Sequence, residues 1–221
     1  MQRVLKRAIL AALLFGGLSA PAQAALITTN PTIIVGDKQF SDFTCSILVV
    51  GVAVPTSCAG VDVTGATDLS GNFGLLFQIG AFVNTIGSTV DILIGYTATV
   101  LDPNYLITDV HLGFNGAITG TGFANVTETV FAGGGVTQLL VQNPPPILDA
   151  TILLPGGFSS VRVTKDILLG VTGPGAGSAA LSFVGQYLSQ TRVPEPGSLA
   201  LLGMAFFGSS MALRRRFRAS A

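Results

Sequence analysis

The stretch Val90-Asp-Ile-Leu-Ile-Gly-Tyr-Thr-Ala-Thr-Val100 decides the fold class. Apolar side chains recur at every second position, so one face of an extended strand would carry Val90, Ile92, Ile94 and Tyr96. On or near the other face, after an irregularity expected at Gly95, lie Asp91, Leu93 and Thr97. Because both faces are partly apolar, the pattern favours an inner strand over an edge strand.

Similar short runs occupy the chain on both sides of this stretch, and none shows a helical period of useful length. The expected strands are 32–35, 46–54, 73–79, 90–100, 105–114, 125–131, 136–142, 151–154, 159–164 and 179–189. Turn sequences separate them: Gly71-Asn72, Asp102-Pro-Asn104, Gly133-Gly-Gly135, Asn143-Pro-Pro-Pro146, Pro155-Gly-Gly157 and Gly173-Pro-Gly175. About ten strands at this spacing, without an internal repeat, predict an all-β fold: an antiparallel β-sandwich, jelly-roll-like in its connections.

Charge is unevenly distributed along the 221 residues. The basic residues of both ends have no acidic partners nearby, whereas residues 25–193 carry four basic and ten acidic side chains, a net charge of about −6. So acidic a domain repels phosphate backbones, which argues against nucleic-acid binding. A charged fraction of only 10%, together with 28 glycines, is typical of a secreted β-protein.

The first 24 residues have the three parts of a secretory signal. Met1 to Arg7 is basic, residues 8–18 are apolar, and Ala22 and Ala24 stand at −3 and −1 of a cut before Ala25. This apolar run is shorter than the roughly 17–25 residues that a spanning helix needs. We therefore predict a cleaved signal peptide over residues 1–24, with an uncleaved anchor as the alternative.

The last residues form a second targeting pattern. Val193-Pro-Glu-Pro196 precedes an uncharged apolar run, 197–213, which as a helix would be about 25 Å long. A basic cluster follows, made of Arg214, Arg215, Arg216 and Arg218. Because basic residues favour the cytoplasmic side, we expect a single transmembrane helix with its arginines inside and residues 25–193 outside.

This order of Val193, Pro194, Glu195 and Pro196, an apolar helix and terminal arginines resembles the PEP-CTERM sorting signal of exopolysaccharide-producing bacteria with an outer membrane. The resemblance implies that an exosortase, an integral-membrane Cys protease-transpeptidase, recognises the motif and removes the helix. The four motif residues would then belong to a substrate. The implied organisation is a signal peptide (1–24), an extracytoplasmic domain (25–192) and a sorting tail (193–221), with an ordinary C-terminal anchor as the alternative.

The middle of the chain also resembles a widespread group of PEP-CTERM substrate ectodomains. The residues that carry this likeness are 91–96, 105–110, 127–129, 163–167 and 186–190. The resemblance implies no activity.

Cys45 and Cys58 are the only cysteines, separated by 12 residues. In an oxidising compartment this spacing predicts a disulfide, worth about 3 kcal/mol in the chain-entropy model. Two free thiols or one reactive thiol are the alternatives, and a catalytic thiol would need a nearby base in a chain with one histidine.

No metal or other cofactor is expected. His111 stands alone on an expected strand, whereas a zinc site needs three or four Cys or His ligands. Calcium could draw oxygens from Asp62 with Asp68, or from Asp102 with Asn104, but neither pair lies in an EF-hand loop. We interpret these acids as solvated loop residues.

The function expected is that of an exported, non-enzymatic surface or matrix protein associated with exopolysaccharide or a biofilm. Its partners would be signal peptidase, the exosortase and the inner membrane before processing. One rival is a carbohydrate-binding module, although Trp is absent and the only tyrosines are Tyr96, Tyr105 and Tyr187. A second is a glycan or peptide hydrolase that uses Glu128 or a pair of aspartates as acid and base.

Overall fold

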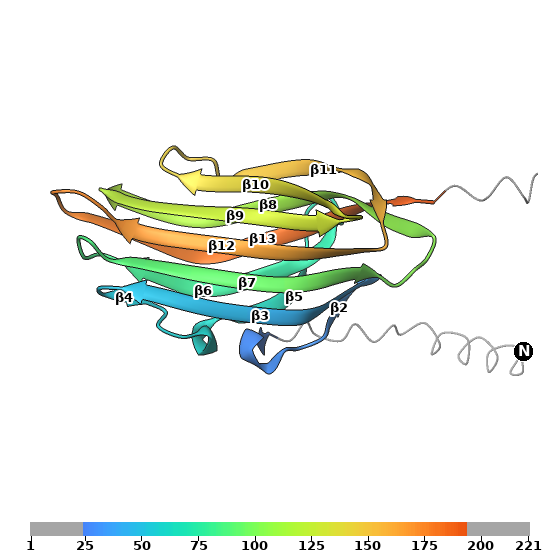
Figure 1. Ribbon diagram of the computed structural model, residues 1–221, viewed down its shortest axis with the longest axis horizontal. Coiled ribbons are helices and arrows are strands. Elements are labelled where there is room, and N and C mark those ends of the chain that lie inside the picture. The colour runs from blue at the N-terminus through green and yellow to red at the C-terminus, as the bar shows by residue number, and fades with distance from the viewer. Residues whose placement is uncertain (1–23, 194–221) are drawn as a thin grey trace, which may run out of the picture.

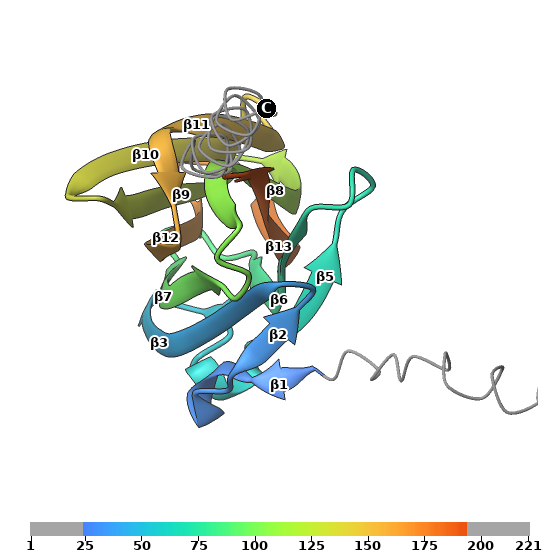
Figure 2. The same ribbon diagram turned by 90° about the vertical axis from the view of Figure 1, so that its right-hand side faces the viewer.

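Two antiparallel sheets pack face to face in the computed structural model, which describes residues 24–193 (Figure 1). Figure 2 shows the two layers side by side. The predicted all-β, antiparallel sandwich is therefore confirmed. It forms because most strands alternate apolar and polar residues, so each sheet has one face that must be covered.

The first sheet, called sheet A here, has seven strands in the order β1-β5-β6-β13-β8-β11, with β4 also paired to β6. Their bounds are β1 Ala25–Leu26, β4 Ala53–Val54, β5 Asp62–Thr67, β6 Phe73–Val83, β8 Tyr105–Gly120, β11 Asp149–Phe158 and β13 Gly177–Arg192. Two short 3-10 helices accompany it, η1 Ile27–Thr29 and η2 Cys58–Gly60.

The second sheet, sheet B, has six strands in the order β10-β9-β12-β7-β3-β2. Their bounds are β2 Ile33–Val35, β3 Lys38–Val50, β7 Thr89–Val100, β9 Gly122–Ala132, β10 Gly135–Asn143 and β12 Ser160–Val171. Consecutive described strands pair with each other only at β2–β3, β5–β6 and β9–β10. Most other connections cross between the layers, so β12 and β13, neighbours in sequence, occupy the interiors of opposite sheets (Figure 1).

The stretch 90–100 behaves as its pattern predicts. It forms most of β7, an inner strand between β12 and β3, and its buried face carries Val90, Ile92, Ile94 and Tyr96. The irregularity expected at Gly95 lies instead in β3, where the register with β7 shifts between Ser41 and Thr44. Asp42, inside that shift, has a φ of 57°, so the extra residue is accommodated on the neighbouring strand.

Strand extents differ from expectation in several places. The range 46–54, expected as one strand, is divided between the end of β3 and β4, and β8 and β12 continue to Gly120 and Val171, beyond their expected ends at 114 and 164. The turn predicted at Pro155-Gly-Gly157 is wrong, because these residues belong to β11 and form the part where its register with β8 shifts between Leu153 and Phe158.

The first half of β3 and all of β5 were not expected. β5 mixes Thr, Gly and Asp with a single large apolar residue, Val63, so its local pattern is weak. The first half of β3 buries Phe40 and Phe43 on the two sides of Asp42, where its register with β7 shifts, which breaks the period-2 alternation.

Several sequence predictions concern residues outside those described. They are the signal peptide over 1–24 apart from its last residue, Pro194 to Pro196 of the sorting motif, the apolar run 197–213 and the terminal arginines. Within residues 24–193, no helix has the length and apolar character needed to cross a membrane.

Candidate functional site

Cys45 and Cys58 form the predicted disulfide, with their Cα atoms 6.1 Å apart. Cys45 lies in β3 of sheet B, and Cys58 begins η2, which precedes β5 of sheet A in the chain. The bond therefore attaches the segment that links β4 to β5 onto the edge region of the sandwich. Neither sulfur is a free thiol, so the alternative of a reactive cysteine is excluded.

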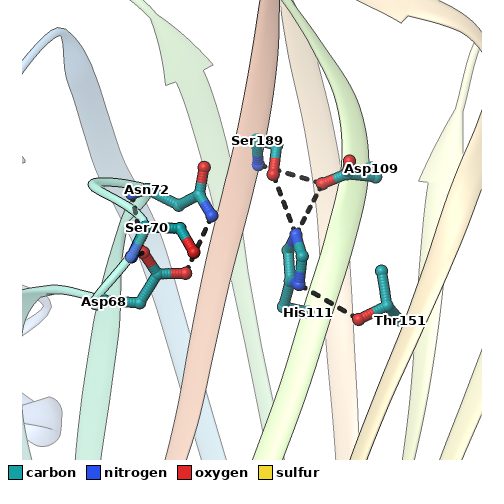
Figure 3. A network of polar contacts seen from close by, with 7 residues as sticks. All are labelled: Asp68, Ser70, Asn72, Asp109, His111, Thr151 and Ser189. Atoms are coloured by element: carbon teal, nitrogen blue, oxygen red, sulfur yellow. Dashed lines mark hydrogen bonds and ion pairs between the residues drawn. The ribbon is translucent and has the colours of Figure 1, made fainter.

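A polar network surrounds His111 on the outer face of sheet A (Figure 3). The imidazole Nε2 lies 2.8 Å from Ser189 Oγ and 2.9 Å from Asp109 Oδ1, and Nδ1 lies 3.0 Å from Thr151 Oγ1. Three neighbouring strands supply these groups, β8, β13 and β11, because Thr151 and Tyr187 stand in register with His111 on its two sides. The His111 side chain is 32% exposed, so solvent reaches it.

This arrangement lines up hydroxyl, imidazole and carboxylate across the ring, from Thr151 through His111 to Asp109. Such an order resembles the way a base activates a hydroxyl. Ser189 shares Nε2 with Asp109, and the backbone N–H of Ser189 donates to Asp109 Oδ1 at 3.2 Å. The network can therefore bind a polar ligand or hold the sheet surface in place.

Asp68 lies beside this network at the turn between β5 and β6 (Figure 3). Its carboxylate accepts hydrogen bonds from the backbone N–H groups of Ser70 and Asn72 and from the Asn72 side chain, each at 2.8 Å. Partial burial acts to raise the pKa of Asp68, but these hydrogen bonds outweigh it and lower the pKa below its ordinary value. Partial burial, followed by the charge of Asp68, raises the pKa of Tyr187.

Of the residues weighed from sequence for calcium, Asp62 is not a loop residue, because it begins β5 and pairs with Gln78 of β6, whereas the others serve local turns. Asp68 caps the β5–β6 turn, and Asp102 Oδ1 accepts from the backbone and side-chain nitrogens of Asn104 at 2.9 and 2.8 Å. Within residues 24–193, no three metal-ligating side chains gather in a single group.

A second polar cluster lies inside the sandwich. Lys165 Nζ contacts both Glu128 Oε2 and Gln186 Oε1, and all three side chains are fully buried. Lys165 and Glu128 stand directly opposite each other on β12 and β9 of sheet B, whereas Gln186 reaches across from β13 of sheet A. The contact therefore joins the interiors of the two sheets.

Strict alternation directs these side chains inward. On β12 the buried residues are Val161, Val163, Lys165, Ile167 and Leu169, and on β9 they are Ala124, Val126, Glu128, Val130 and Ala132. Gln186 stands between Val184 and Leu188 on the buried face of β13. Glu128 was considered from sequence only as a possible acid, and Lys165 and Gln186 were missed. The available signal was a polar residue at an inward position of three otherwise apolar faces.

Aromatic rings surround the buried cluster. Lys165 Nζ lies 6.0 Å from the Phe77 ring centroid, and the Phe77 and Tyr96 centroids are 5.7 Å apart. Burial lowers the pKa of the Lys165 ammonium, while the charge of Glu128 acts in the opposite direction. Burial and then Glu128 raise the pKa of Tyr96 far above its ordinary value.

Three buried polar atoms of this region have no hydrogen-bond partner among the described residues: Glu128 Oε1, Gln186 Nε2 and Tyr96 Oη. An unpartnered buried polar atom is costly, so a cluster that contains three of them is uncommon in a core.

A carboxyl pair marks the outer face of sheet B. Asp91 lies close enough to Asp166 for their charges to interact, and a shallow hollow beside it is lined by Ser46, Ile47, Leu48, Asp91 and Leu93. Partial burial, and then the charge of Asp166, raise the pKa of Asp91. Leu48 and Leu93 are exposed, so this face is more apolar than the face around His111.

Structural likenesses are weak. A domain of bacteriophage CBA120 tailspike protein 4, described as enzymatically active, is 17% identical over 66% of this chain and 19% of its own length, with a TM-score of 0.29. TmCBM61, solved with β-1,4-galactotriose, is 8% identical over 66% of this chain and 88% of its own length, with a TM-score of 0.31. The family 11 carbohydrate-binding module from Clostridium thermocellum is 10% identical over 65% of this chain and 88% of its own length, with a TM-score of 0.22. At such TM-scores these likenesses carry no argument about function. No curated protein matches the chain.

The C-terminal end of the chain gives a specific match. Residues 192–216 match the PEP-CTERM protein-sorting motif, and β13 ends at Arg192, where that match begins. The sorting motif thus follows the last strand of the sandwich without an intervening described segment. The chain carries a PEP-CTERM protein-sorting motif at its C-terminal end, as expected of an exosortase substrate.

Proposed function

We propose that this chain is an exported, non-enzymatic surface or extracellular-matrix protein, whose β-sandwich is delivered by its PEP-CTERM tail and then processed. The single observation that carries the proposal is the continuity of β13 with the motif at Arg192. A folded domain that ends where a sorting signal begins is suited to be the cargo of that signal.

The finer steps follow the order of segments in the chain. Signal peptidase removes residues 1–24, the apolar run 197–213 holds the exported chain in the inner membrane, and an exosortase acts at Val193 to Pro196. The released or displayed sandwich, with its net charge of about −6, then lies among exopolysaccharide or within a biofilm.

A non-enzymatic role is supported by the position of Glu128. This carboxyl was the leading acid for a hydrolase, and it is fully buried in contact with Lys165, so an external polymer has no access to it. The Thr151–His111–Asp109 alignment lies on the outer face of sheet A, where the pairing of β8 with both β11 and β13 shifts next to Asp109. A reagent that labels activated hydroxyls is expected to leave Thr151 unmodified.

The test compares the wild-type chain with a variant in which Pro194, Glu195 and Pro196 are all alanine, expressed in a host that has an exosortase. Ser198→Ala, two residues after Pro196 and within the apolar run, is the matched control. Intact mass is measured in membrane, surface and medium fractions. We expect wild type and Ser198→Ala to lose residues 1–24 and the helix, and the triple variant to retain the helix in the membrane fraction. Equal processing of all three chains would refute the sorting proposal.

A second candidate function is glycan binding at the outer face of sheet A. The observation that favours it is the cluster of Asp109, His111, Thr151 and Ser189 beside the partly exposed Tyr187 ring, since sugars are held by polar groups next to aromatic rings. Binding of the host exopolysaccharide is measured by calorimetry for wild type, His111→Ala and Tyr187→Ala. Thr99→Ala, on the outer face of sheet B, is the control. Loss of binding in the first two variants alone supports this candidate, and unchanged binding in both removes it.

A further inference from the structure

We propose that Lys165 and Gln186 form an intramolecular isopeptide bond that ties sheet A to sheet B, with Glu128 as the acid–base group. This inference is independent of the proposed function, because it concerns the interior of the sandwich and not its delivery.

The geometry places the reacting groups together. Lys165 Nζ contacts the carboxamide oxygen of Gln186 and the carboxylate of Glu128 at once, and no other described acidic side chain is fully buried. β12 and β13 hold Lys165 and Gln186 from opposite layers, and β9 fixes Glu128 beside the lysine through their direct pairing. A nucleophile and an acyl group held in contact by a rigid scaffold react as if at a very high effective concentration, up to about 10⁵–10⁸ M.

The surroundings favour the reactive form of the amine. Burial lowers the pKa of the Lys165 ammonium, and Phe77 and Tyr96 keep the cluster apolar. Proton transfer from Lys165 to Glu128 replaces a buried ion pair by a neutral amine and a carboxylic acid, which a dry interior favours. The neutral amine is a nucleophile, as for other desolvated lysines.

The atoms and charges of the reaction balance without an added reactant. Lys165 Nζ attacks Cδ of Gln186, and the new Nζ–Cδ bond gives a tetrahedral centre. Glu128, protonated by the first transfer from Lys165, gives that proton to the departing Nε2 and then takes the second proton that Nζ loses, so the Cδ–Nε2 bond breaks, ammonia leaves and Glu128 ends as a carboxylic acid. The product is a secondary amide, and no oxidation or reduction occurs.

Gln186 is assigned as the acyl group and Glu128 as the acid–base group, because these are the two side chains that contact Lys165 Nζ. The reaction needs one acyl group and one group that accepts and donates protons, and Glu128 is the carboxyl that contacts Lys165. If Glu128 were the acyl group, the amide of Gln186 would have to move protons, which an amide does poorly. The assignment also accounts for Gln186 Nε2, a buried atom without a partner, as the leaving nitrogen.

Peptide mapping of the full chain, purified from its host, tests the bond. Trypsin normally cleaves after Arg162, Lys165 and Arg192. Acylated Lys165 resists cleavage, so we expect one peptide, 163–192, lighter than its sequence mass by about 17 Da, the mass of ammonia. This peptide ends before the sorting motif, so processing of the tail does not alter it.

Three variants test the roles assigned to Glu128 and Gln186 and provide a control. Glu128→Gln removes the acid–base group at nearly constant size, so cleavage at Lys165 and the full sequence mass should return. Gln186→Glu changes the leaving group from ammonia to water, so the loss should become about 18 Da. Lys38→Met is the control, because Lys38 Nζ also contacts a glutamine, Gln190 Oε1 at 2.5 Å, but beside Asp37, which is 20% exposed. This variant should keep the lighter peptide.

Two results on the wild-type chain would overturn the proposal, even if a variant fails to fold. One is normal tryptic cleavage after Lys165 in a chain whose mass is lower than its sequence mass only by the hydrogens lost in forming the disulfide. The other is a loss of about 18 Da in a species that joins peptides 39–162 and 163–192, since that would make Glu128 the acyl group.

Discussion

Lys165 and Glu128 lie directly opposite each other on β12 and β9, and both side chains point into the sandwich, where neither is exposed to solvent. The pair interrupts two inner faces that are otherwise apolar. The polar groups of the pair lack the water that would normally solvate them, so the energy of each depends on its contact with the other.

Removing one partner should therefore be much more harmful than removing both. We expect Glu128→Ala to lower the free energy of unfolding by about 3–5 kcal/mol, because it leaves the Lys165 amine buried without its carboxylate. Chemical denaturation of the purified chain measures the change. Loss of the proposed Lys165–Gln186 cross-link adds to the effect in the same direction.

The double variant Lys165→Met, Glu128→Leu is the comparison. Apolar residues of similar size suit both inner faces, so this variant should be more stable than Glu128→Ala. A double variant less stable than the single one would contradict this account of the buried pair.

Tyr96→Phe should stabilise the protein. The Tyr96 ring packs on Phe43 and Phe77 with centroids 5.7 Å away in each case, but its hydroxyl is buried without a partner. Removing that hydroxyl while keeping the ring should raise the free energy of unfolding by about 1 kcal/mol. Tyr105→Phe, at a partly exposed ring, is the control and should change it by less than about 0.5 kcal/mol. A destabilised Tyr96→Phe would show that the hydroxyl has a bonding partner in solution.

Loss of the disulfide should lower stability through the unfolded chain. Cys45 and Cys58 are 13 positions apart, and closing a loop of that size stabilises a fold by about 3 kcal/mol. We expect the Cys45→Ser, Cys58→Ser variant to melt at a lower temperature, and a reducing agent to lower the Tm of the wild type but not of the variant. Equal Tm values for wild type and variant would remove the disulfide as a stabilising element.

Asp91 should make the stability depend on pH. Its pKa is raised in the folded protein, so its protonated form is favoured there. The stability from this group is therefore present below the unfolded pKa, near about 3.9, and is lost as the pH rises through the folded pKa. We expect Asp91→Asn to raise the free energy of unfolding at neutral pH by up to about 0.5 kcal/mol, with no gain in the acid range below the unfolded pKa.

Asp149→Asn, at an exposed position at the start of β11, serves as the control for charge alone. Thermal melts of the two variants and the wild type across the acid and neutral ranges provide the measurement. If Asp149→Asn stabilises as much as Asp91→Asn, net charge rather than the Asp91–Asp166 pair is responsible.

Much of the fold could be predicted locally. Period-2 alternation identified β7 and its buried face, and Gly- and Pro-rich stretches marked most of the turns, because both signals act within a few residues. Local sequence patterns did not predict the structure where pairing with neighbouring strands decides the backbone conformation. β5 has a weak pattern of its own and becomes a strand between β1 and β6, and Pro155-Gly-Gly157 stays in β11 because β8 lies alongside.

The candidate sites also differ in whether a local sequence signal predicts them. The pairing of Cys45 with Cys58 followed from composition and compartment, since the chain offers no other cysteine. The network of His111 needed three strands from distant parts of the sequence, so a single histidine gave no signal.

By itself, the sequence determined the all-β class, the inward face of each alternating strand and the sorting motif, because each depends on residue types at short, fixed spacing. Only the tertiary structure decided which inward residues meet. Lys165, Glu128 and Gln186 come from β12, β9 and β13, and the order of strands in two packed sheets brings their polar ends into a single apolar interior. That order is set by long-range burial of apolar surface, which no short stretch of the chain encodes.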